Sequence, residues 1–394
     1  MKRNISLLFV LFSIFIFFSC SKTTPEEEFG KINALIRQNR LLDAVIKLED
    51  FIDKYPDSKY IPYAKLNLAR IHLRTQNYEE ALSICDELIK KNNNDIVFVN
   101  KVKSVKLNAL LGLKKYDDAI SMISEDIKKM KKEITSLEKN KNTDKKELKA
   151  FYVNLSDAIS FEARVFTDKI MNLKKLKNID KKNIISKLES MSDYLKELSK
   201  KVDGKEKNII ENNYYKVNYY KLVALSSFEN KEKFLSFYES LKKDKNIPDY
   251  LKLQIVQYVI DAYYLANKKP ENAEKEVDWV ISNWLPDDLN AYWLYHHIAV
   301  FYKKNGQPQK AKKFYGIIKK ETEKLIASTK DKNEKSSYII SLGDLYYQLG
   351  DYKKSKEYYL KAKKEFPNSM PVKLGLADRK LKALENITKK NAEK

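Results

Sequence analysis

Apolar residues recur along most of the chain in steps of three and four, which is the spacing of one face of an α-helix. Segments 66–73 and 81–89 each carry such a stripe, and the polar pair Gln76–Asn77 between them has the character of a turn. The pattern therefore predicts an all-α protein whose short helices pair as antiparallel hairpins, with longer, coiled-coil-like helices in the middle. The longer stripes run through 127–137, 148–166 and 188–202.

Glycine and proline are scarce, with 8 and 9 copies in 394 residues, and no proline lies between Pro62 and Pro248. A sheet protein of this length needs many tight turns, and tight turns use these two residues. Hydrophobic residues make up 43% of the chain, which is enough for a large core. The composition therefore favours helices over strands.

The first twenty residues have the arrangement of an export signal. Two basic residues precede a 14-residue apolar run at 5–18, which is shorter than the roughly 20 residues that a membrane span needs. Ser19 and Cys20 close this run, and the whole segment resembles a bacterial lipoprotein signal. The resemblance implies a signal peptide over 1–19 that is removed, and acyl chains on Cys20. An uncleaved anchor or a plain signal peptide is the alternative.

Small residues mark a repeating unit within the predicted hairpins. Ala44, Ala81 and Ala119 stand 37 and 38 residues apart, and each lies in the second helix of a pair. With large apolar residues around them and prolines such as Pro56 and Pro367, these units resemble the tetratricopeptide repeat. The resemblance implies hairpins stacked into a superhelix. Three further anchors of this kind are Ala273, Ala311 and Ser355.

The repeats and the long stripes together divide the chain into parts. Heptad-like stripes on Lys- and Glu-rich helices separate two blocks of repeats, and they could also form a seam for a partner. The predicted parts are a signal peptide (1–19), a lipidated tether (20–27), an N-terminal repeat block (28–127), a long-helix middle segment with degenerate repeats (128–249) and a C-terminal repeat block (250–394).

Part of the N-terminal block also resembles the BamD or YfiO family of outer-membrane-assembly lipoproteins. The resemblance covers 29–127 and rests on Tyr55-Pro56-Asp57-Ser58, Tyr63-Ala64 and Tyr78-Glu79-Glu80-Ala81. It implies a lipid-anchored scaffold of the cell envelope, most simply at the outer membrane facing the periplasm. Its expected partners are other envelope proteins, together with the membrane through the lipid anchor.

The net charge of +22 raises the question of a nucleic-acid partner. Only seven of the 76 basic residues are arginine, whereas base and phosphate recognition favours the planar fork of arginine. We therefore expect no nucleic-acid partner, and we interpret most of the lysines as a solvated surface.

The sequence offers no chemistry of its own. It lacks the phosphate-binding, dinucleotide-binding, zinc-protease and nucleophile-elbow motifs. His296 and His297 are adjacent on a helix, so their side chains point about 100° apart and cannot chelate one ion together. Cys85 falls on an apolar helix face and is expected to be buried. We therefore predict no catalytic residues, no metal, no cofactor and no small-molecule substrate.

The family resemblance implies a binding groove along the first helices of the hairpins. Its mixed aromatic and basic residues favour a peptide of acidic character, although Tyr63 and Trp293 could instead pack only between helices. The predicted groove residues of the N-terminal block are Tyr63, Leu66, Arg70, Leu73 and Arg74. Those of the C-terminal block are Trp293, His296, Val300, Lys303, Lys304, Ile340, Asp344, Tyr347 and Gln348.

Three functions are compatible with these features. The first is a non-catalytic scaffold in an envelope machine such as outer-membrane protein assembly. The second is a structural component of another periplasmic machine, for example a flagellar-motor collar. The third is a small-ligand binder or an enzyme within the middle helices. The absence of catalytic motifs makes the first two the stronger hypotheses.

Overall fold

The computed structural model describes residues 23–92, 94–140, 142–173, 177–228, 231–286 and 288–392. Within these ranges every regular element is a helix, and most helices pack against the next one along the chain, which confirms the all-α prediction. The predicted signal peptide and Cys20 lie outside the described residues. Of the helices that are described, none is long and apolar enough to cross a membrane.

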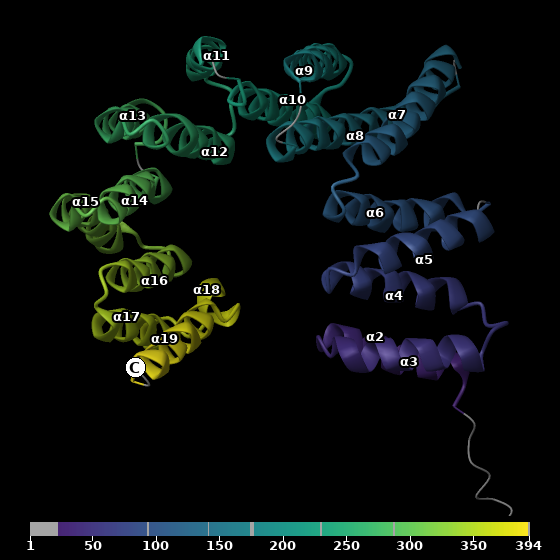
Figure 1. Ribbon diagram of the computed structural model, residues 1–394, viewed down its shortest axis with the longest axis horizontal. Coiled ribbons are helices and arrows are strands. Elements are labelled where there is room, and N and C mark those ends of the chain that lie inside the picture. The colour runs from purple at the N-terminus through teal and green to yellow at the C-terminus, as the bar shows by residue number, and fades with distance from the viewer. Residues whose placement is uncertain are drawn as a thin grey trace, which may run out of the picture. The chain divides into compact units, whose positions relative to one another are not determined.

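The chain divides into two units, with the boundary between Lys132 and Glu133. In the first unit the helices stack in chain order, each against its neighbour (Figure 1). The apolar faces predicted from the sequence form its core, in which Leu48, Phe51 and Leu88 are almost fully buried. Its helices are α2 (Pro25–Arg37), α3 (Leu41–Lys54), α4 (Ile61–Arg74), α5 (Tyr78–Lys91) and α6 (Ile96–Gly112), and α7 (Tyr116–Lys139) crosses the boundary.

The second unit begins with long helices and continues with shorter ones. The long helices α8 (Lys145–Asn172), α9 (Asn178–Ser199) and α10 (Gly204–Leu225) all contact one another, as heptad-like stripes predict. The shorter elements are α11 (Glu232–Lys242), α12 (Asp249–Val259), the π-helix η1 (Ile260–Leu265), α13 (Pro270–Asn283), α14 (Leu289–Lys304), α15 (Pro308–Ser328), α16 (Lys332–Gln348), α17 (Tyr352–Glu365), α18 (Met370–Lys373) and α19 (Leu376–Ala392).

Six hairpins in the described ranges share one turn. In each, a single residue adopts a left-handed backbone with φ between 57° and 80°. The following N–H then returns to a carbonyl five positions earlier, as from Asn77 to His72 at 2.8 Å and from Asp351 to Tyr346 at 2.9 Å. This arrangement ends the first helix and reverses the chain. The left-handed residues are Asn39, Gln76, Lys114, Lys268, Gly306 and Gly350.

Each predicted Ala or Ser anchor lies five residues after one of these turns. All six anchors are at most 2% exposed, so each of these small residues is buried. The last hairpin shows why small residues occupy these positions. A methyl group on Gly343 would overlap the ring of Tyr359, and Ser355 donates its hydroxyl to the Gly343 carbonyl at 2.8 Å.

Two helix starts test the expected boundaries. Asp144 caps α8 by accepting the N–H of Lys146 at 2.8 Å, so this helix begins between the apolar stripes at 127–137 and 148–166. The tether predicted over 20–27 is too long, because α2 already begins at Pro25. Thr24 and Glu27 cap its first turn reciprocally, each side chain accepting the other residue's backbone N–H at 3.2 Å.

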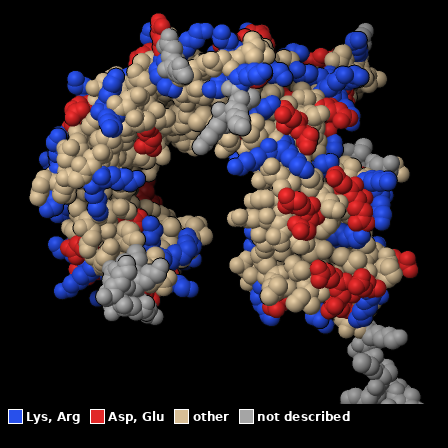
Figure 2. All heavy atoms as spheres, in the orientation of Figure 1, with Lys and Arg blue, Asp and Glu red and all other residues tan. Residues whose placement is uncertain are grey.

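The excess of basic residues is not confined to one continuous surface. Figure 2 shows Lys and Arg atoms interspersed with Asp and Glu atoms on the visible face of both units. Many lysines are in ion pairs, for example Lys65 with Glu87 at 2.7 Å and Lys103 with Asp126 at 2.5 Å. This distribution fits the interpretation of most lysines as a solvated surface, and the ion pairs are a further feature that the structure adds.

Candidate partner-binding groove

A pocket of about 440 Å³ lies along the first helices of two neighbouring hairpins, α14 and α16. On α16 its wall consists of Ser341, Asp344, Tyr347 and Gln348, which recur in steps of three and four and so share one helix face. The pocket thereby brings together four predicted groove residues, since Trp293 joins the last three. The remaining lining residues are Asn290, Tyr359, Lys380 and Ala383.

Asp344 is the polar centre of this pocket. Its carboxylate accepts a hydrogen bond from the Tyr359 hydroxyl at 2.7 Å and pairs with the Lys380 ammonium at 2.8 Å. Burial raises the pKa of Tyr359 above its usual value, and Asp344 raises it further, so the hydroxyl remains a donor. The three groups form a fixed polar site beside the aromatic rings of Trp293 and Tyr347, a combination that suits a peptide backbone and its side chains.

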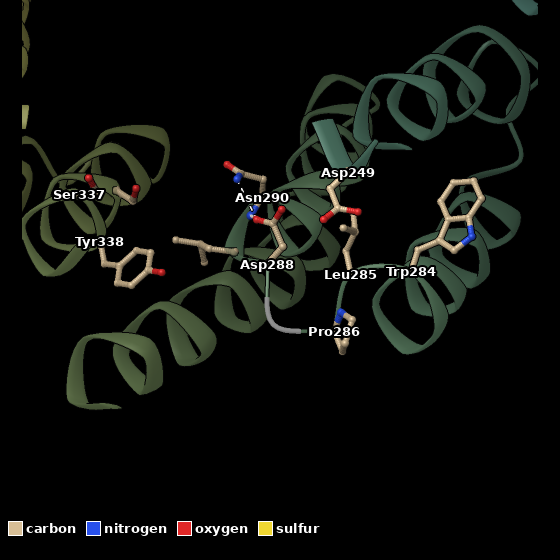
Figure 3. Close-up of a pocket in the computed structure, with 10 residues that line it drawn as sticks. Asp249, Trp284, Leu285, Pro286, Asp288, Asn290, Ser337 and Tyr338 are labelled. Atoms are coloured by element: carbon tan, nitrogen blue, oxygen red, sulfur yellow. Dashed lines mark hydrogen bonds between the residues drawn. The ribbon is translucent and has the colours of Figure 1, made fainter. Parts of the chain in front are cut away.

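A second pocket, of about 510 Å³, continues the first. Asn290 and Ser341 line both pockets, so the two form one groove along α14 and α16. Figure 3 shows the carboxylates of Asp249 and Asp288 at the centre of this pocket, with residues of α16 opposite them. The other lining residues are Trp284, Leu285, Pro286, Leu289, Ser337 and Tyr338.

The charge of this groove differs from the expectation. Asp288 accepts the backbone N–H of Asn290 at 2.8 Å and makes no ion pair among the described residues. Asp249 pairs with Lys252 at 2.8 Å, a lysine that does not line the pocket. Three carboxylates therefore line the groove against the single ammonium of Lys380. The lining of this groove is therefore more acidic than the mixed aromatic and basic character predicted from the sequence.

The remaining predicted residues of α14 lie outside both pockets. His296 is partly buried between the rings of Trp293 and Tyr315, at centroid distances of 5.7 and 5.8 Å. Burial lowers the pKa of His296, and the charges of His297 and Lys303 lower it further, which favours the neutral imidazole. Val300 is partly buried and Lys304 is exposed.

Lys303 and Ile340 also lie apart from the pocket walls. The Lys303 ammonium donates to the Gln348 carbonyl at 3.2 Å, which ties α14 to the end of α16. Ile340 is only 5% exposed and packs in the core with Tyr359 and Leu384. The assignment of Ile340 to the groove surface is therefore wrong, because α16 turns the next residue, Ser341, into the groove.

In the N-terminal block the predicted residues follow α4. Tyr63 is 43% exposed and meets Phe98 edge to face at 5.2 Å. Leu66 is only 2% exposed and packs in the core, so its assignment to the groove surface is also wrong. Leu73 is partly buried against the same core, Arg70 is exposed, and Arg74 donates to Asn39 at 2.7 Å.

Several groove residues were missed by the sequence analysis. Asn290 precedes Trp293 by one helical turn and shares its face, so the three-residue spacing was a usable signal. Lys380 comes from α19, which follows the hairpin of the last predicted anchor, Ser355. No local signal marks it, because its place beside Asp344 depends on how α19 packs on α17. In the described part of the chain, no group of three or more His, Cys, Asp or Glu residues could hold a metal ion.

Three tetratricopeptide repeat families match parts of the chain, at residues 29–96, 294–316 and 337–369. The first match covers most of α2 and all of α3 to α5, the second covers most of α14 and the start of α15, and the third covers most of α16 and all of α17. The chain therefore carries tetratricopeptide repeats, which are modules for binding other proteins. Catalysis is not typical of such modules.

Among solved structures, the chain is similar to a tetratricopeptide repeat protein from Parabacteroides merdae. The two share 12% identity over 92% of this chain and 98% of that one, with a TM-score of 0.35. Yeast Tom70 shares 13% identity over 93% of this chain and 96% of its own, with a TM-score of 0.22. None of the curated proteins compared with the chain matches it in sequence.

Proposed function

We propose that this protein is a non-catalytic scaffold of a bacterial cell envelope, anchored by acyl chains on Cys20, and that it holds other envelope proteins through its repeats. Outer-membrane protein assembly, on the periplasmic face of the outer membrane, is the setting that the N-terminal resemblance favours. The proposal joins two features, a signal that resembles those of lipoproteins and a body of protein-binding repeats.

One observation carries the binding part of this proposal. The groove on α14 and α16 collects Trp293, Asp344, Tyr347 and Gln348 from two hairpins, although they are up to 55 positions apart in the sequence. Partly buried aromatic side chains next to fixed polar groups are the usual anchors of protein–protein contacts. The carboxylates along the groove favour a partner segment that carries lysine or arginine.

Photo-crosslinking in cells tests this assignment. A photo-crosslinking amino acid at Asn290, inside the groove, is expected to capture a partner through a basic segment, because Asp288 and Asp344 lie along the same groove. The matched control places the same amino acid at Lys361, which is exposed on α17 and lines neither pocket. Capture of barrel-assembly proteins at Asn290 alone supports the outer-membrane role. Capture of flagellar-motor proteins supports the collar instead, and equal labelling at both positions contradicts a groove site.

The anchor leads to a second prediction. Cys20→Ala is expected to move the protein from the membrane fraction to the soluble fraction, because two or more acyl chains hold a protein stably at a membrane. Fractionation followed by immunoblotting measures the change. A Cys85→Ala variant is the control, since Cys85 is fully buried and burial raises the pKa of its thiol to about 12. A wild-type protein found wholly in the soluble fraction contradicts the lipid anchor.

A further inference from the structure

A second groove lies in the middle of the chain, on the long helix α10. Helices α9 and α11 both pack against α10, and a space of about 1150 Å³ lies between their facing sides. This groove is lined by Asn178, Lys181, Lys182, Ile185, Ser186 and Glu189 of α9, by Lys221 and Leu225 of α10, by Ser227 and Phe228 of the following turn, and by Glu232, Lys233, Ser236, Phe237 and Ser240 of α11.

Both walls of this middle groove are continuous helix faces. The lining residues of α9 recur in steps of three and four from Asn178 to Glu189, a length of roughly 17 Å at 1.5 Å per residue. Those of α11 run from Glu232 to Ser240, roughly 12 Å. A slot walled by two to three turns of helix on each side has the length and form of a site for another helix.

The floor of the middle groove is apolar. Leu225 is 5% exposed, and Ile185 and Phe237 are partly buried against the core formed by α10, α11 and α12. Three serines on the walls, Ser186, Ser236 and Ser240, are small and exposed, so they leave room for a backbone to approach. An occupant that places apolar side chains on this floor gains free energy from their burial.

The rim of the middle groove is basic. Lys182 and Lys233 are exposed and make no ion pair among the described residues. The Lys181 ammonium donates to the backbone carbonyl of Ser227 at 3.1 Å. Because this acceptor is neutral, it does not compensate the positive charge of Lys181. Lys221 pairs with the lining carboxylate of Glu189 at 3.0 Å, and Glu232 is the other carboxylate of the lining, so four ammonium groups face two carboxylates among the described lining residues. Figure 2 shows Lys and Arg atoms together with some Asp and Glu atoms over the region of α9 and α11.

We propose that this middle groove binds an amphipathic helix of a partner protein, with apolar residues on one face and acidic residues along its flanks. The apolar floor and the length of the walls select a helix over a lipid headgroup, which needs only the lysines. Because three of the four charged residues that line the groove on α14 and α16 are carboxylates, the two sites prefer segments of opposite charge. The protein thus holds two different segments at once, and this second site does not depend on the first.

Fluorescence anisotropy with two synthetic peptides tests the proposal on the full chain. The first peptide carries leucine at i, i+3, i+4 and i+7 with glutamate at most other positions, and the second has the same composition in an order that abolishes the apolar face. The amphipathic peptide is expected to bind at least tenfold more tightly. Equal binding of both peptides, or no binding of either, overturns the proposal, because the apolar floor would then play no part.

Charge reversal locates the site. Lys182→Glu with Lys233→Glu is expected to weaken binding of the amphipathic peptide about tenfold, since it removes two of the three rim charges that have no carboxylate partner and adds two repulsive ones. The matched control is Lys196→Glu with Lys205→Glu, which changes the net charge equally at exposed positions outside the groove. An equal loss in both variants overturns the assignment.

A third comparison separates a helix from a membrane surface. Ile185→Ser removes an apolar floor residue and leaves the lysines in place, so it is expected to weaken peptide binding. Binding of the protein to vesicles of phosphatidylcholine with phosphatidylserine is measured in parallel. If these vesicles bind through Lys182 and Lys233 while the peptide does not, the middle groove is a lipid site and the proposal is wrong. Circular dichroism confirms that each variant remains folded.

Discussion

Replacement of Glu276 with alanine is expected to lower the free energy of unfolding of the second unit by about 3 kcal/mol. The buried Tyr238 hydroxyl loses its acceptor, and the Lys242 ammonium keeps only the more distant carboxylate of Glu239, at 3.5 Å. Glu276 is 7% exposed, and its Oε1 accepts from the Tyr238 hydroxyl at 2.6 Å and pairs with the Lys242 ammonium at 3.1 Å. Burial raises the pKa of Tyr238 well above its usual value, as does the Glu276 carboxylate, so the hydroxyl stays protonated.

The arrangement around Lys242 explains why the effect is large. Its ammonium lies 3.9 Å from the centre of the Trp279 ring and its side chain is only 12% exposed, so little water can replace the lost carboxylate. The Tyr264 hydroxyl also reaches Glu276, at 3.4 Å. The carboxylate therefore joins α11, η1 and α13, and its loss is expected to loosen all three elements.

Amide hydrogen exchange is the suitable measurement, because repeat arrays can unfold in parts. Protection is expected to fall in α11 and α13 of Glu276→Ala. Glu276→Gln, which keeps an acceptor for Tyr238, is expected to lose less. Glu274→Ala is the matched control, since Glu274 lies on the same helix in a more exposed pair with Lys313. If Glu276→Ala changes exchange no more than Glu274→Ala, the buried network does not stabilise this unit.

The hairpins could be predicted because their signal is local. An Ala or Ser anchor five residues after a left-handed turn is a requirement of two helices that pack closely, and it is visible within one repeat. Gly343 and Ser355 show this requirement directly. Gly343 leaves room for the ring of Tyr359, and the Ser355 hydroxyl donates a hydrogen bond to the Gly343 carbonyl. The long middle helices were predictable for the same reason, because their stripes persist for many turns.

The groove surface could be predicted only in part, because it depends on the rotation between successive hairpins. Each helix face spans several positions, and the packing of the next hairpin decides which of them remain uncovered. In α16 this packing buries Ile340 and turns Ser341 outward, a difference of one position. The middle groove was even harder to predict from the sequence, because its walls come from α9 and α11, which are separated in sequence by the whole of α10.

The charge of each site was the least predictable property. Counting residues along the chain indicates a basic protein everywhere, yet Asp249, Asp288 and Asp344 meet along one groove. Asp288 serves as the N-cap of α14, which explains why an aspartate stands at the start of this helix. The cap does not explain why the other two carboxylates lie along the same groove. Local charge is set by which helix ends and faces come together, and a sequence average hides it.

Replacement of both Trp293 and Tyr347 with alanine is expected to weaken partner binding about a hundredfold, because each truncated aromatic anchor costs about 1.4 kcal/mol, or tenfold in affinity. Both side chains line the same pocket and both are partly buried, so they present a rigid apolar surface beside Asp344. Isothermal titration with the protein captured at Asn290 measures the loss. Membrane attachment and the helical circular dichroism signal are expected to persist.

The control must separate lost contact from lost stability, since Trp293 also packs against the core of α13 to α15. Phe301→Ala with Tyr358→Ala removes two aromatic side chains that are likewise partly buried against that core but line neither pocket. This control is expected to destabilise the unit to a similar degree and to leave the affinity unchanged. If the Trp293 and Tyr347 variant unfolds and the control does not, the two residues serve the core. If it binds as tightly as the wild type, the partner docks elsewhere, most simply on α4 around Tyr63.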